Sequence, residues 1–436
     1  MDVTSTSLLA WSDGLAPGHA RDDDGMLTIG GARAEDLVRA HRSPLLVLDL
    51  AVLDAAIGAM RAACDPHGVR ISYGGKALLL TALARRLCGR GLGIDVCSLG
   101  ELATAERAGV APEHLTLHGA GKLDEELRAA LVGRVSRIVV DSIAELRRLA
   151  AARADEVPLD VLLRLNTGIE AHTHEFVRTG GDDTKFGIAP HEESTAQSLF
   201  RASPHLRLRG LHSHIGSQIF EAAPFVANVE ALVDASARFS AAGFTVDTLI
   251  AGGGFGIQTS PDGTGESLDI EAMIGAMAEA AREASARGLP VPTLEIEPGR
   301  SLIAHAGTSL YRVLAVKRYE RRTFVIVDGS IADNPRPALY GAYHHVVAAS
   351  PIAGEMFDAT ISGRSCENDT LGQARLPRDV REGDLLALCT TGAYTYSMAS
   401  NYNRYPRPAV VAIENGEPRL FARRERIEEM LQNDVD

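Results

Sequence analysis

The chain has 436 residues, 45% of them hydrophobic and 23% charged, a size and composition that fit two or three soluble domains. Its formal net charge of -13 argues against nucleic acid or an anionic membrane surface as the main partner. No signal peptide or membrane-spanning run is evident, and the five cysteines show no Cys-x-x-Cys spacing. We therefore expect a cytoplasmic protein with free thiols rather than a secreted, disulfide-bonded one.

Strand-like and helix-like segments alternate until about residue 300. Residues 1 to about 30 show few periodic cues, and residues 45–49 read as a strand. Helix-like stretches such as 99–108 and 142–152 follow most of the later strand-like runs, which is typical of parallel βαβ units. Eight such units predict a TIM-type (β/α)8 barrel, whereas a doubly wound sheet would need an early Gly-x-Gly-x-x-Gly turn that this sequence lacks. The eight strand-like runs are 69–73, 92–96, 114–118, 136–140, 159–165, 207–214, 246–250 and 293–297.

The sequence changes character after about residue 305. Several runs rich in Val, Leu and Ile follow one another without helical spacers, separated by turns that contain Gly, Pro and Asp. This pattern predicts a mostly β domain that ends in a short helix over residues 425–432. The expected fold class is therefore α/β, with a barrel followed by a mostly β C-terminal domain. The β-domain runs are 309–316, 324–328, 385–388 and 409–412.

A single lysine stands at the end of the first barrel strand. Lys76 follows the run 69–73 and two glycines, Gly74 and Gly75. A lysine amine can bond covalently to a carbonyl group when burial or neighbouring charges depress its pKa. Most lysines at strand ends are simply solvated, so Lys76 becomes a catalytic candidate only if other strand ends bring complementary groups to it.

Two later strand ends supply such groups. In TIM barrels the catalytic residues lie at the carboxyl ends of the strands, and phosphate commonly binds after strands 7 and 8. The glycine-rich run 252–256 follows strand 7, and its backbone N–H groups could approach an anion closely. Glu297 follows strand 8, where a carboxylate could keep a pyridine nitrogen protonated. A lysine, a phosphate cradle and this carboxylate are the parts that a pyridoxal 5′-phosphate (PLP) enzyme needs.

Two histidines end the sixth barrel strand. His214 could lie against the ring of such a cofactor, although a lone histidine is more often an ordinary core residue. His212 and His214 could instead form a metal pair, because alternate residues of a strand share a face. The sequence shows no further His/Asp cluster on other strand ends, so we expect no metal.

These residues belong to a longer series of blocks, which are 72–77, 91–96, 170–174, 184–187, 212–219, 252–257, 297–301, 333–340, 366–367 and 391–403. The series resembles the alanine-racemase-type (fold type III) PLP decarboxylases, and most closely those that act on diaminopimelate. The blocks occur in the family's order and cover nearly the whole chain. The resemblance implies a PLP-dependent carboxy-lyase of lysine biosynthesis, which converts meso-2,6-diaminopimelate to L-lysine and CO2.

Residue by residue, the resemblance implies how the cofactor is held. Lys76 would carry the cofactor covalently, Glu297 would face the pyridine nitrogen, and His214 would stack on the ring. Tyr394 would reach the cofactor from the β domain. The residues implied for the phosphate are Ser217, Gly254, Gly256, Gly299 and Arg300.

The resemblance also implies a substrate site and a dimer. Cys366 would be the proton donor and would look into the active site of a partner subunit, so the enzyme would be a homodimer with shared sites. The residues implied for the far end of the amino-acid substrate are Arg300, Arg336, Tyr340, Glu367 and Tyr394.

The resemblance corrects the domain order as well. In this fold the N-terminal segment joins the C-terminal β domain rather than the barrel. The expected domains are residues 1–40 as the N-terminal segment of the β domain, 41–305 as the PLP-binding barrel and 306–436 as the C-terminal β domain.

The sequence departs from the family pattern at three places, and the first of them bears on substrate specificity. Residues 368–370 read Asn-Asp-Thr where the family usually has Ser-Gly-Asp, next to the implied substrate site. Residues 120–121 replace two asparagines, and Thr395 replaces a glycine. The change at residues 368–370 keeps a related decarboxylase open as an alternative, acting on another diamino acid or on a carrier-bound amino acid.

A non-catalytic homologue is a further alternative. Such a protein should have lost the lysine or the proton donor, and this sequence keeps both Lys76 and Cys366. The polar, glycine-containing loop 172–185 is a candidate cover for the site.

Overall fold

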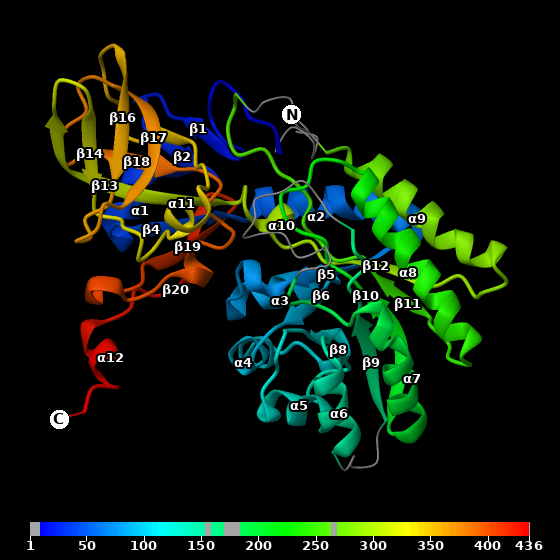
Figure 1. The fold of residues 1–436 in the computed structure, drawn as a ribbon. Coiled ribbons are helices and arrows are strands. Elements are labelled where there is room, and N and C mark those ends of the chain that lie inside the picture. Colours follow the sequence, from blue (N-terminus) through cyan, green and yellow to red (C-terminus); the bar gives the residue numbers. More distant parts are fainter. Residues whose placement is uncertain (1–8, 153–157, 170–183, 263–267, 436) are drawn as a thin grey trace. The chain divides into compact units, whose positions relative to one another are not determined.

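The computed structural model describes residues 9–152, 158–169, 184–262 and 268–435. They form two compact units, and Figure 1 traces the elements of each. The barrel unit comprises Met60–Ile257 and Ser267–Gly299. The β unit comprises Met1–Ala59, Gln258–Glu266 and Arg300–Asp436.

Eight parallel strands of the described residues close into a barrel (Figure 1). In their order around the barrel they are β10 (Leu206–His212), β11 (Thr248–Ile250), β12 (Thr293–Ile296), β5 (Arg70–Gly74), β6 (Gly93–Val96), β7 (Leu115–Leu117), β8 (Arg137–Val140) and β9 (Leu159–Arg164). Each neighbouring pair is parallel. All eight strands overlap the runs that the sequence predicts, β5 and β10 each extending one residue beyond their runs, so the predicted barrel is confirmed.

Serine caps begin two of the barrel helices. Ser98 accepts a hydrogen bond from the backbone N–H of Glu101, and Ser142 accepts one from Glu145. Each Ser-x-x-Glu segment thereby satisfies an N–H group that the first helical turn leaves unpaired. The helices that follow, α4 (Leu99–Arg107) and α6 (Ile143–Ala151), lie where the sequence predicts helices. Further helices of this unit are α3 (Thr81–Gly89), α5 (Asp124–Leu131), α7 (Glu193–Ala202), α8 (Ala223–Ala241) and α9 (Ile270–Ala286).

The barrel interior combines apolar and charged side chains. Val139, Leu162 and Ile250 form an apolar cluster. Asp95 on β6 and Glu295 on β12 are only 5% and 2% exposed. Buried charges are costly unless they are paired and hydrogen-bonded. The side chains that pair with these two acids therefore show where polar groups gather inside the barrel.

A nine-stranded mixed sheet forms the centre of the described β unit. The fully buried strand β4 (Leu45–Asp49) pairs antiparallel with β13 (Gly307–Arg318) and parallel with β19 (Ala409–Glu414). The other strands of this sheet are β14 (Thr323–Val327), β15 (Val346–Ala348), β16 (Met356–Ser362), β17 (Thr370–Pro377), β18 (Leu385–Leu388) and β20 (Glu417–Ala422). The predicted mostly β domain is therefore confirmed.

A small antiparallel sheet from the N-terminal region completes the β unit. Leu27 and Ile29 are buried in one core cluster with Leu45, Leu310 and Val411. The strands of the small sheet are β1 (His19–Arg21), β2 (Leu27–Ile29) and β3 (Ala32–Arg33). The helices of this unit include α1 (Ala34–His41), α10 (Arg300–Ile303), α11 (Arg336–Tyr340) and α12 (Ile427–Leu431).

The division into units differs at its edges from the predicted domain boundaries. Residues 41–59 were expected in the barrel domain, but they belong to the β unit because β4 pairs with two of its strands. Helix α2 (Leu50–Cys64) then continues from the β unit into the barrel unit. Strand β4 is followed by a helix, as a barrel strand would be. This local strand–helix pattern does not distinguish β4 from a strand of the barrel domain.

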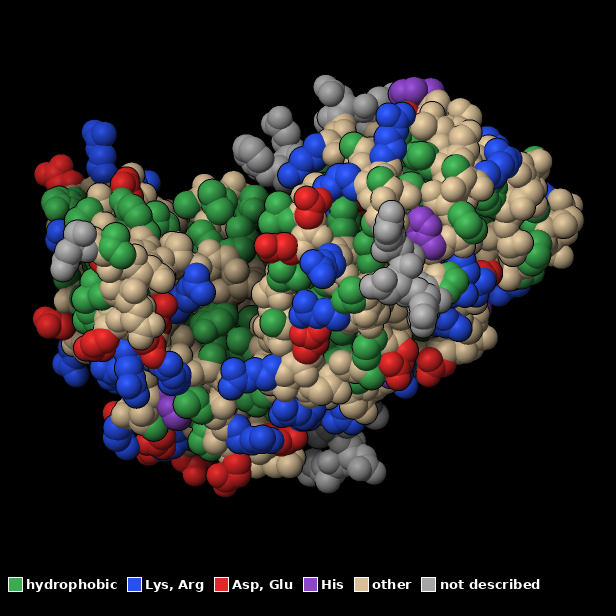
Figure 2. All heavy atoms as spheres, turned by 90° about the horizontal axis from the view of Figure 1, so that it is seen from below, with side chains coloured by type: hydrophobic (Ala, Val, Ile, Leu, Met, Phe, Trp, Pro, Cys, Tyr) green, Lys and Arg blue, Asp and Glu red, His purple; other side chains and the backbone are tan. Residues whose placement is uncertain are grey.

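The surface carries charges of both signs. Among the described residues drawn on the face in Figure 2, Lys and Arg side chains are interspersed with Asp and Glu. None of the described helices combines the length and apolar character that a membrane span requires.

Candidate active site

Lys76 lies on a turn that its neighbours fix. It sits in a short 3-10 helix (Gly75–Ala77) directly after β5. A Cβ atom added to Gly75 would lie 2.6 Å from the carbonyl oxygen of Asp95, so only glycine permits this close approach to β6. The buried hydroxyl of Tyr73 donates a hydrogen bond to the carbonyl of Leu78 and closes the turn around Lys76. The lysine itself is exposed at the carboxyl end of the strands.

Glu297 is held by two imidazoles. His212 Nε2 lies 3.1 Å from Glu297 Oε2, and His118 Nε2 lies 3.3 Å from Glu297 Oε1. Burial alone would raise the pKa of Glu297, but His212 and His118 outweigh it and hold that pKa well below its usual value. The carboxylate is therefore an anion at neutral pH although its side chain is only 11% exposed.

His214 is a neutral ring with a fixed tautomer. The backbone N–H of Gly253 donates a hydrogen bond to His214 Nδ1 over 3.1 Å, so the ring carries its proton on Nε2. Burial, followed by Lys76 and Arg164, lowers the pKa of His214 well below its ordinary value. A neutral ring held from one edge can pack against a flat cofactor without adding a charge to it.

One cavity of about 240 Å³ brings these groups together at the carboxyl ends of the strands. Cys97 lies in its wall, and burial together with Glu101 raises the pKa of its thiol to about 12, so the thiol stays protonated. The cavity is lined by Gly74, Gly75, Lys76, Asp95, Cys97, His118, Gly119, Ala120, Arg164, Phe186, His212, His214 and Glu297.

The loops that are expected to bind the cofactor phosphate pack against one another. A Cβ atom added to Gly254 would lie 2.0 Å from the Gly216 carbonyl oxygen and 3.4 Å from the Ser217 Cα atom. The structure thus brings Ser217 beside Gly254, and the positive φ of Gly254 (97°) also favours glycine there. The backbone N–H of Gly256, however, donates to the carbonyl of Ile219, so that N–H is already used. Gly299 lies next to Gly74: a Cβ atom added to Gly74 would be 3.8 Å from the Cα atom of Gly299.

Two arginines meet in the β unit. The Arg300 guanidinium carbon lies 4.7 Å from the centre of the Tyr394 ring, and Tyr394 has a positive φ of 60° that a non-glycine residue rarely adopts. Burial, followed by the charge of Arg300, lowers the pKa of Arg336 to about 9, while Tyr394 and Tyr340 oppose this shift. Arg336 is 8% exposed, and its Nε atom makes no hydrogen bond within the described residues. Such a cation is suited to an anionic ligand.

The implied proton donor lies on an exposed edge of the β unit. The backbone N–H of Cys366 donates to the Asn403 side chain over 3.0 Å, and the Tyr402 hydroxyl donates to Glu367 over 2.5 Å. Asp369, one of the departures from the family pattern, is 4% exposed and accepts a weak hydrogen bond from Ile331 N–H. Its carboxylate therefore points into the protein and holds the loop, while Glu367 stays outside.

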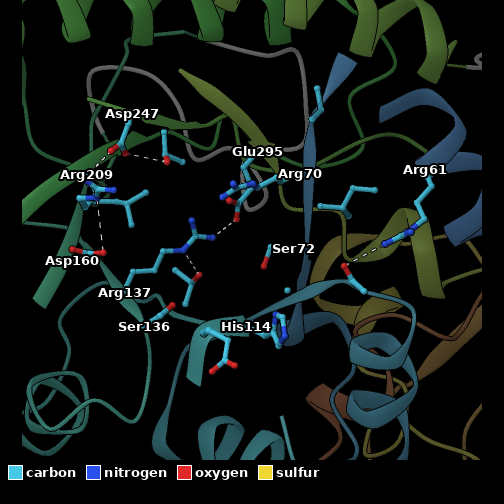
Figure 3. A pocket seen from close by; sticks show the side chains of 18 of the residues that line it. Arg61, Arg70, Ser72, His114, Ser136, Arg137, Asp160, Arg209, Asp247 and Glu295 are labelled. Carbon is cyan, nitrogen blue, oxygen red and sulfur yellow. Dashed lines mark hydrogen bonds and ion pairs between the residues drawn. The ribbon is translucent and has the colours of Figure 1, made fainter. Parts of the chain in front are cut away.

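A second, larger cavity lies at the opposite end of the strands. It measures about 590 Å³ and opens among the residues that begin the barrel strands (Figure 3). Its central charges pair with each other: Arg137 binds Glu295 and donates to Thr116, and Arg209 lies 2.9 Å from Asp247.

Sequence reasoning missed several residues of the smaller cavity. His118, Asp95 and Arg164 line it but were not predicted as site residues. His118 and Asp95 follow or end barrel strands on the same side as Lys76, which is the signal that could have identified them. The ligand atoms of His118, His212 and Glu297 lie within 4.8 Å of one another, close enough for a metal ion, so the expectation of no metal stays a prediction. The block 170–174 and most of the loop 172–185 lie outside the described residues.

Comparisons with known proteins agree with this geometry. Residues 51–304 match the family model described as pyridoxal-dependent decarboxylase, pyridoxal binding domain. The chain is 41% identical to diaminopimelate decarboxylase of Actinosynnema pretiosum subsp. auranticum, over 99% of this chain and 98% of the relative. It is 40% identical to diaminopimelate decarboxylase of Bacillus subtilis (strain 168), over 95% and 96%. The crystal structure of diaminopimelate decarboxylase from M. jannaschii in co-complex with L-lysine superposes with a TM-score of 0.88 at 28% identity, covering 96% of this chain and 98% of that one.

The family match spans more than half of the chain and includes every strand of the barrel. The sequence relatives extend the likeness through the β unit to nearly the full length of both proteins. The likeness therefore covers both the Lys76 cavity and the paired arginines, not the fold alone. On these grounds the chain belongs to the pyridoxal-dependent decarboxylases, and among them to the diaminopimelate decarboxylase family.

Proposed function

We propose that this chain removes one carboxyl group from meso-2,6-diaminopimelate and releases L-lysine and CO2, with PLP as its cofactor. The chain is a PLP-dependent amino-acid decarboxylase by family. The observation that carries the proposal is the cavity in which Lys76, His214 and the ionised Glu297 meet. The two relatives compared above are diaminopimelate decarboxylases at about 40% identity to this chain.

The cavity residues fit PLP. Glu297 Oε1 is buried and makes no hydrogen bond of acceptable geometry with the described residues, so it has a free lone pair for a pyridinium N–H. The glycine loop around Gly254 approaches its neighbours too closely for any side chain, as a backbone cradle for a phosphate requires. When bound, PLP supplies an electron sink for the carbanion that loss of CO2 leaves behind.

The protein's own side chains position the cofactor and the substrate and polarise the reacting bond. Lys76 presents its amine at the cavity and is the residue proposed to hold the cofactor. Glu297 contributes a fixed negative charge in a site largely excluded from water, where electrostatic stabilisation is strongest. The neutral ring of His214 would limit the movement of the cofactor ring by packing against one of its faces. Together these residues hold the reacting bond in one orientation.

Two arginines are proposed to read the far end of the substrate. The distal carboxylate of diaminopimelate suits Arg300 and Arg336, because a guanidinium can donate two parallel hydrogen bonds to a carboxylate. The lowered pKa of Arg336 supports this role, since an anion would relieve the repulsion between the two cations. Tyr340 and Tyr394 add hydroxyl groups to the same cluster.

Cys366 is proposed to deliver the proton to the new C–H bond across a homodimer interface, with Glu367 binding the distal ammonium of the substrate. Both side chains are exposed on the single chain, as residues that serve a partner's site would be. The Asn403 and Tyr402 contacts hold the two residues on one edge.

Release of CO2 from meso-diaminopimelate, L-lysine and L-ornithine by the purified enzyme tests the substrate. Lysine and ornithine lack the distal carboxylate, so we expect them to react at least about a hundredfold more slowly, the cost of leaving charged hydrogen-bond donors unpaired. Arg336→Lys should raise KM for diaminopimelate at least about tenfold and leave the cofactor spectrum unchanged. Equal turnover of lysine or ornithine would instead favour a decarboxylase of another diamino acid.

Mixing two inactive variants tests the shared site. Lys76→Ala and Cys366→Ala should each be nearly inactive, and subunit exchange between them should restore activity, because one site of each mixed dimer then has both groups. Exchange is verified separately with a mass-tagged copy. Exchange without recovery would contradict the proposed partner role of Cys366.

A further inference from the structure

One imidazole lies between two buried carboxylates in the barrel. His118 Nε2 is 3.4 Å from Asp95 Oδ1 and 3.3 Å from Glu297 Oε1. The side chains of His118 and Asp95 are 12% and 6% exposed. Two carboxylates this close in a poorly solvated place cannot both stay ionised cheaply unless a cation lies between them.

The hydrogen-bond partners of the two acids agree with this reading. Asp95 Oδ1 also accepts a 2.6 Å hydrogen bond from the Ser72 hydroxyl, so its role is that of an acceptor. Glu297 Oε2 is taken by His212. His118 Nε2 lies almost equally far from its two carboxylate neighbours, so one N–H divides between them and satisfies neither with full geometry.

We infer that His118 is a positioning residue, whose imidazolium bridges Asp95 and Glu297 and keeps the Glu297 carboxylate ionised and turned toward the cavity. The inference rests on the proposed PLP function, because it assigns His118 to the residue that faces the pyridine nitrogen. His118 acts through Glu297 and is not itself assigned a contact with the substrate.

The surrounding charges support the imidazolium form. Burial by itself would lower the pKa of His118, but Glu297 and Asp95 outweigh it and raise the pKa, while Lys122 opposes them. His212 differs, because burial lowers its pKa to about 4 and leaves it neutral. The titratable and charged groups facing this cluster are Lys76 after β5, Asp95, Cys97 and Glu101 from β6 and α4, Lys122 after β7, Arg137 on β8, Arg164 on β9, His212 and His214 from β10, and Glu295 and Glu297 from β12.

Nitrogen NMR of ¹⁵N-histidine-labelled protein tests the charge directly. At pH 7 we expect one histidine, identified by its absence in His118→Gln, to show two protonated ring nitrogens in both the cofactor-free and the PLP-loaded protein. In Asp95→Asn the same ring should lose one of these protons near neutral pH, because one of its two anions is gone. A neutral His118 ring in the wild type would overturn the inference.

Equilibrium dialysis of PLP against cofactor-free protein provides the second readout. His118→Gln should weaken PLP binding about ten- to a hundredfold, the range for losing one charge-assisted hydrogen bond. The pH at which affinity declines on the acid side should also rise by about one unit, because Glu297 then gains a proton more easily. His114→Gln, at the exposed opposite end of the same strand, is the matched control and should bind PLP like the wild type.

The outcomes separate this inference from the proposed function. If the protein binds PLP as expected but does not decarboxylate diaminopimelate, the proposed function is wrong. The effect of His118→Gln on PLP binding would still support the inference about His118. Unchanged PLP affinity and an unchanged acid limit in His118→Gln would overturn the inference. If His118→Gln fails to fold by circular dichroism, Asp95→Asn decides through the NMR signal and the same dialysis, with the same expected directions.

Discussion

The two ends of the barrel differ in how well their buried polar atoms are satisfied. The amino-end cavity is the larger, about 590 Å³ against about 240 Å³, yet Arg137 and Glu295 at its centre pair with each other. Within the described part of the chain, Arg61 Nε is buried there without a hydrogen-bond partner, although its Nη2 donates to a backbone carbonyl. In the smaller cavity, Asp95 and Glu297 both keep a carboxylate oxygen without a hydrogen bond from the described residues. Unsatisfied buried acceptors, rather than volume, indicate where a ligand bond is to be made.

Two glutamates at adjacent inward positions make the same point. Glu295 lies on β12 toward the amino end, and Glu297 follows the strand toward the carboxyl end. Burial raises the pKa of Glu295 even though Arg137 opposes the shift. The imidazoles around Glu297 lower its pKa instead. Identical side chains two residues apart therefore have opposite protonation tendencies, which their neighbours determine.

Replacing the lysine should have the largest effect. We expect Lys76→Ala to lose at least about a thousandfold in kcat, as for removal of a group that acts in the chemistry itself. Treatment with borohydride should attach the cofactor to Lys76 in the wild type, as peptide mass mapping would show. Lys317→Ala, on an exposed part of β13, is the control and should retain activity. Labelling of Lys122 or Lys185 would reassign the site.

The paired glutamates allow a matched exchange. Glu297→Gln, loaded at a saturating concentration of PLP, should have a kcat about a hundred- to a thousandfold lower, because the substitution removes a fixed charge from the reacting site. Glu295→Gln leaves the partly buried Arg137 without its anion and should cost about 3 kcal/mol of stability, while the folded fraction keeps its kcat. Kinetics and urea unfolding measure both variants. Equal effects on kcat would show that the two ends of the barrel are not functionally distinct.

The sequence predicted the barrel well because its signals are local. Most strands are short runs rich in Leu, Ile or Val, and Ser98 and Ser142 cap helices within four residues of themselves. Strands β16 and β17 were not predicted, because more than half of their residues are partly or fully exposed and their apolar content is diluted. Strand β4 was assigned to the wrong unit because its pairing with β13 and β19 depends on residues far away in the sequence.

Residues of the candidate site could be predicted where a single side chain follows a predicted strand, and less well where several residues act together. Lys76 and Glu297 follow predicted strands directly. His118 received no role, because its importance comes from Asp95 and Glu297, which lie on other strands. Gly256 stays a predicted phosphate residue, and the hydrogen bond from its N–H to Ile219 is a pairing between loops that no local pattern reveals.

The pH dependence of stability should show the buried neutral ring of His212. Its pKa is about 4 in the folded chain, mainly through burial, against 6.5 ordinarily. Between these values the unfolded chain binds a proton that the folded chain does not, so stability falls as the pH falls from about 6.5 to 4. His212→Asn should reduce that slope by up to about 1.4 kcal/mol per pH unit, measured by urea unfolding across this range. Parallel profiles for the two proteins would rule out a buried neutral His212.

Removing one hydroxyl group at each end of the barrel should have the smallest effects on stability and PLP binding. Ser72 donates to Asp95 in the group that holds Glu297, and Thr116 accepts from Arg137 in the amino-end pair. Ser72→Ala and Thr116→Val should each cost about 1 kcal/mol of stability, the usual value of one buried hydrogen bond. Only Ser72→Ala should also weaken PLP binding, by a few-fold, because Asp95 then holds His118 less firmly. Dialysis at pH 7 distinguishes them, and a similar loss of affinity in both variants would mean that the polar interior responds as one unit rather than as two separate ends.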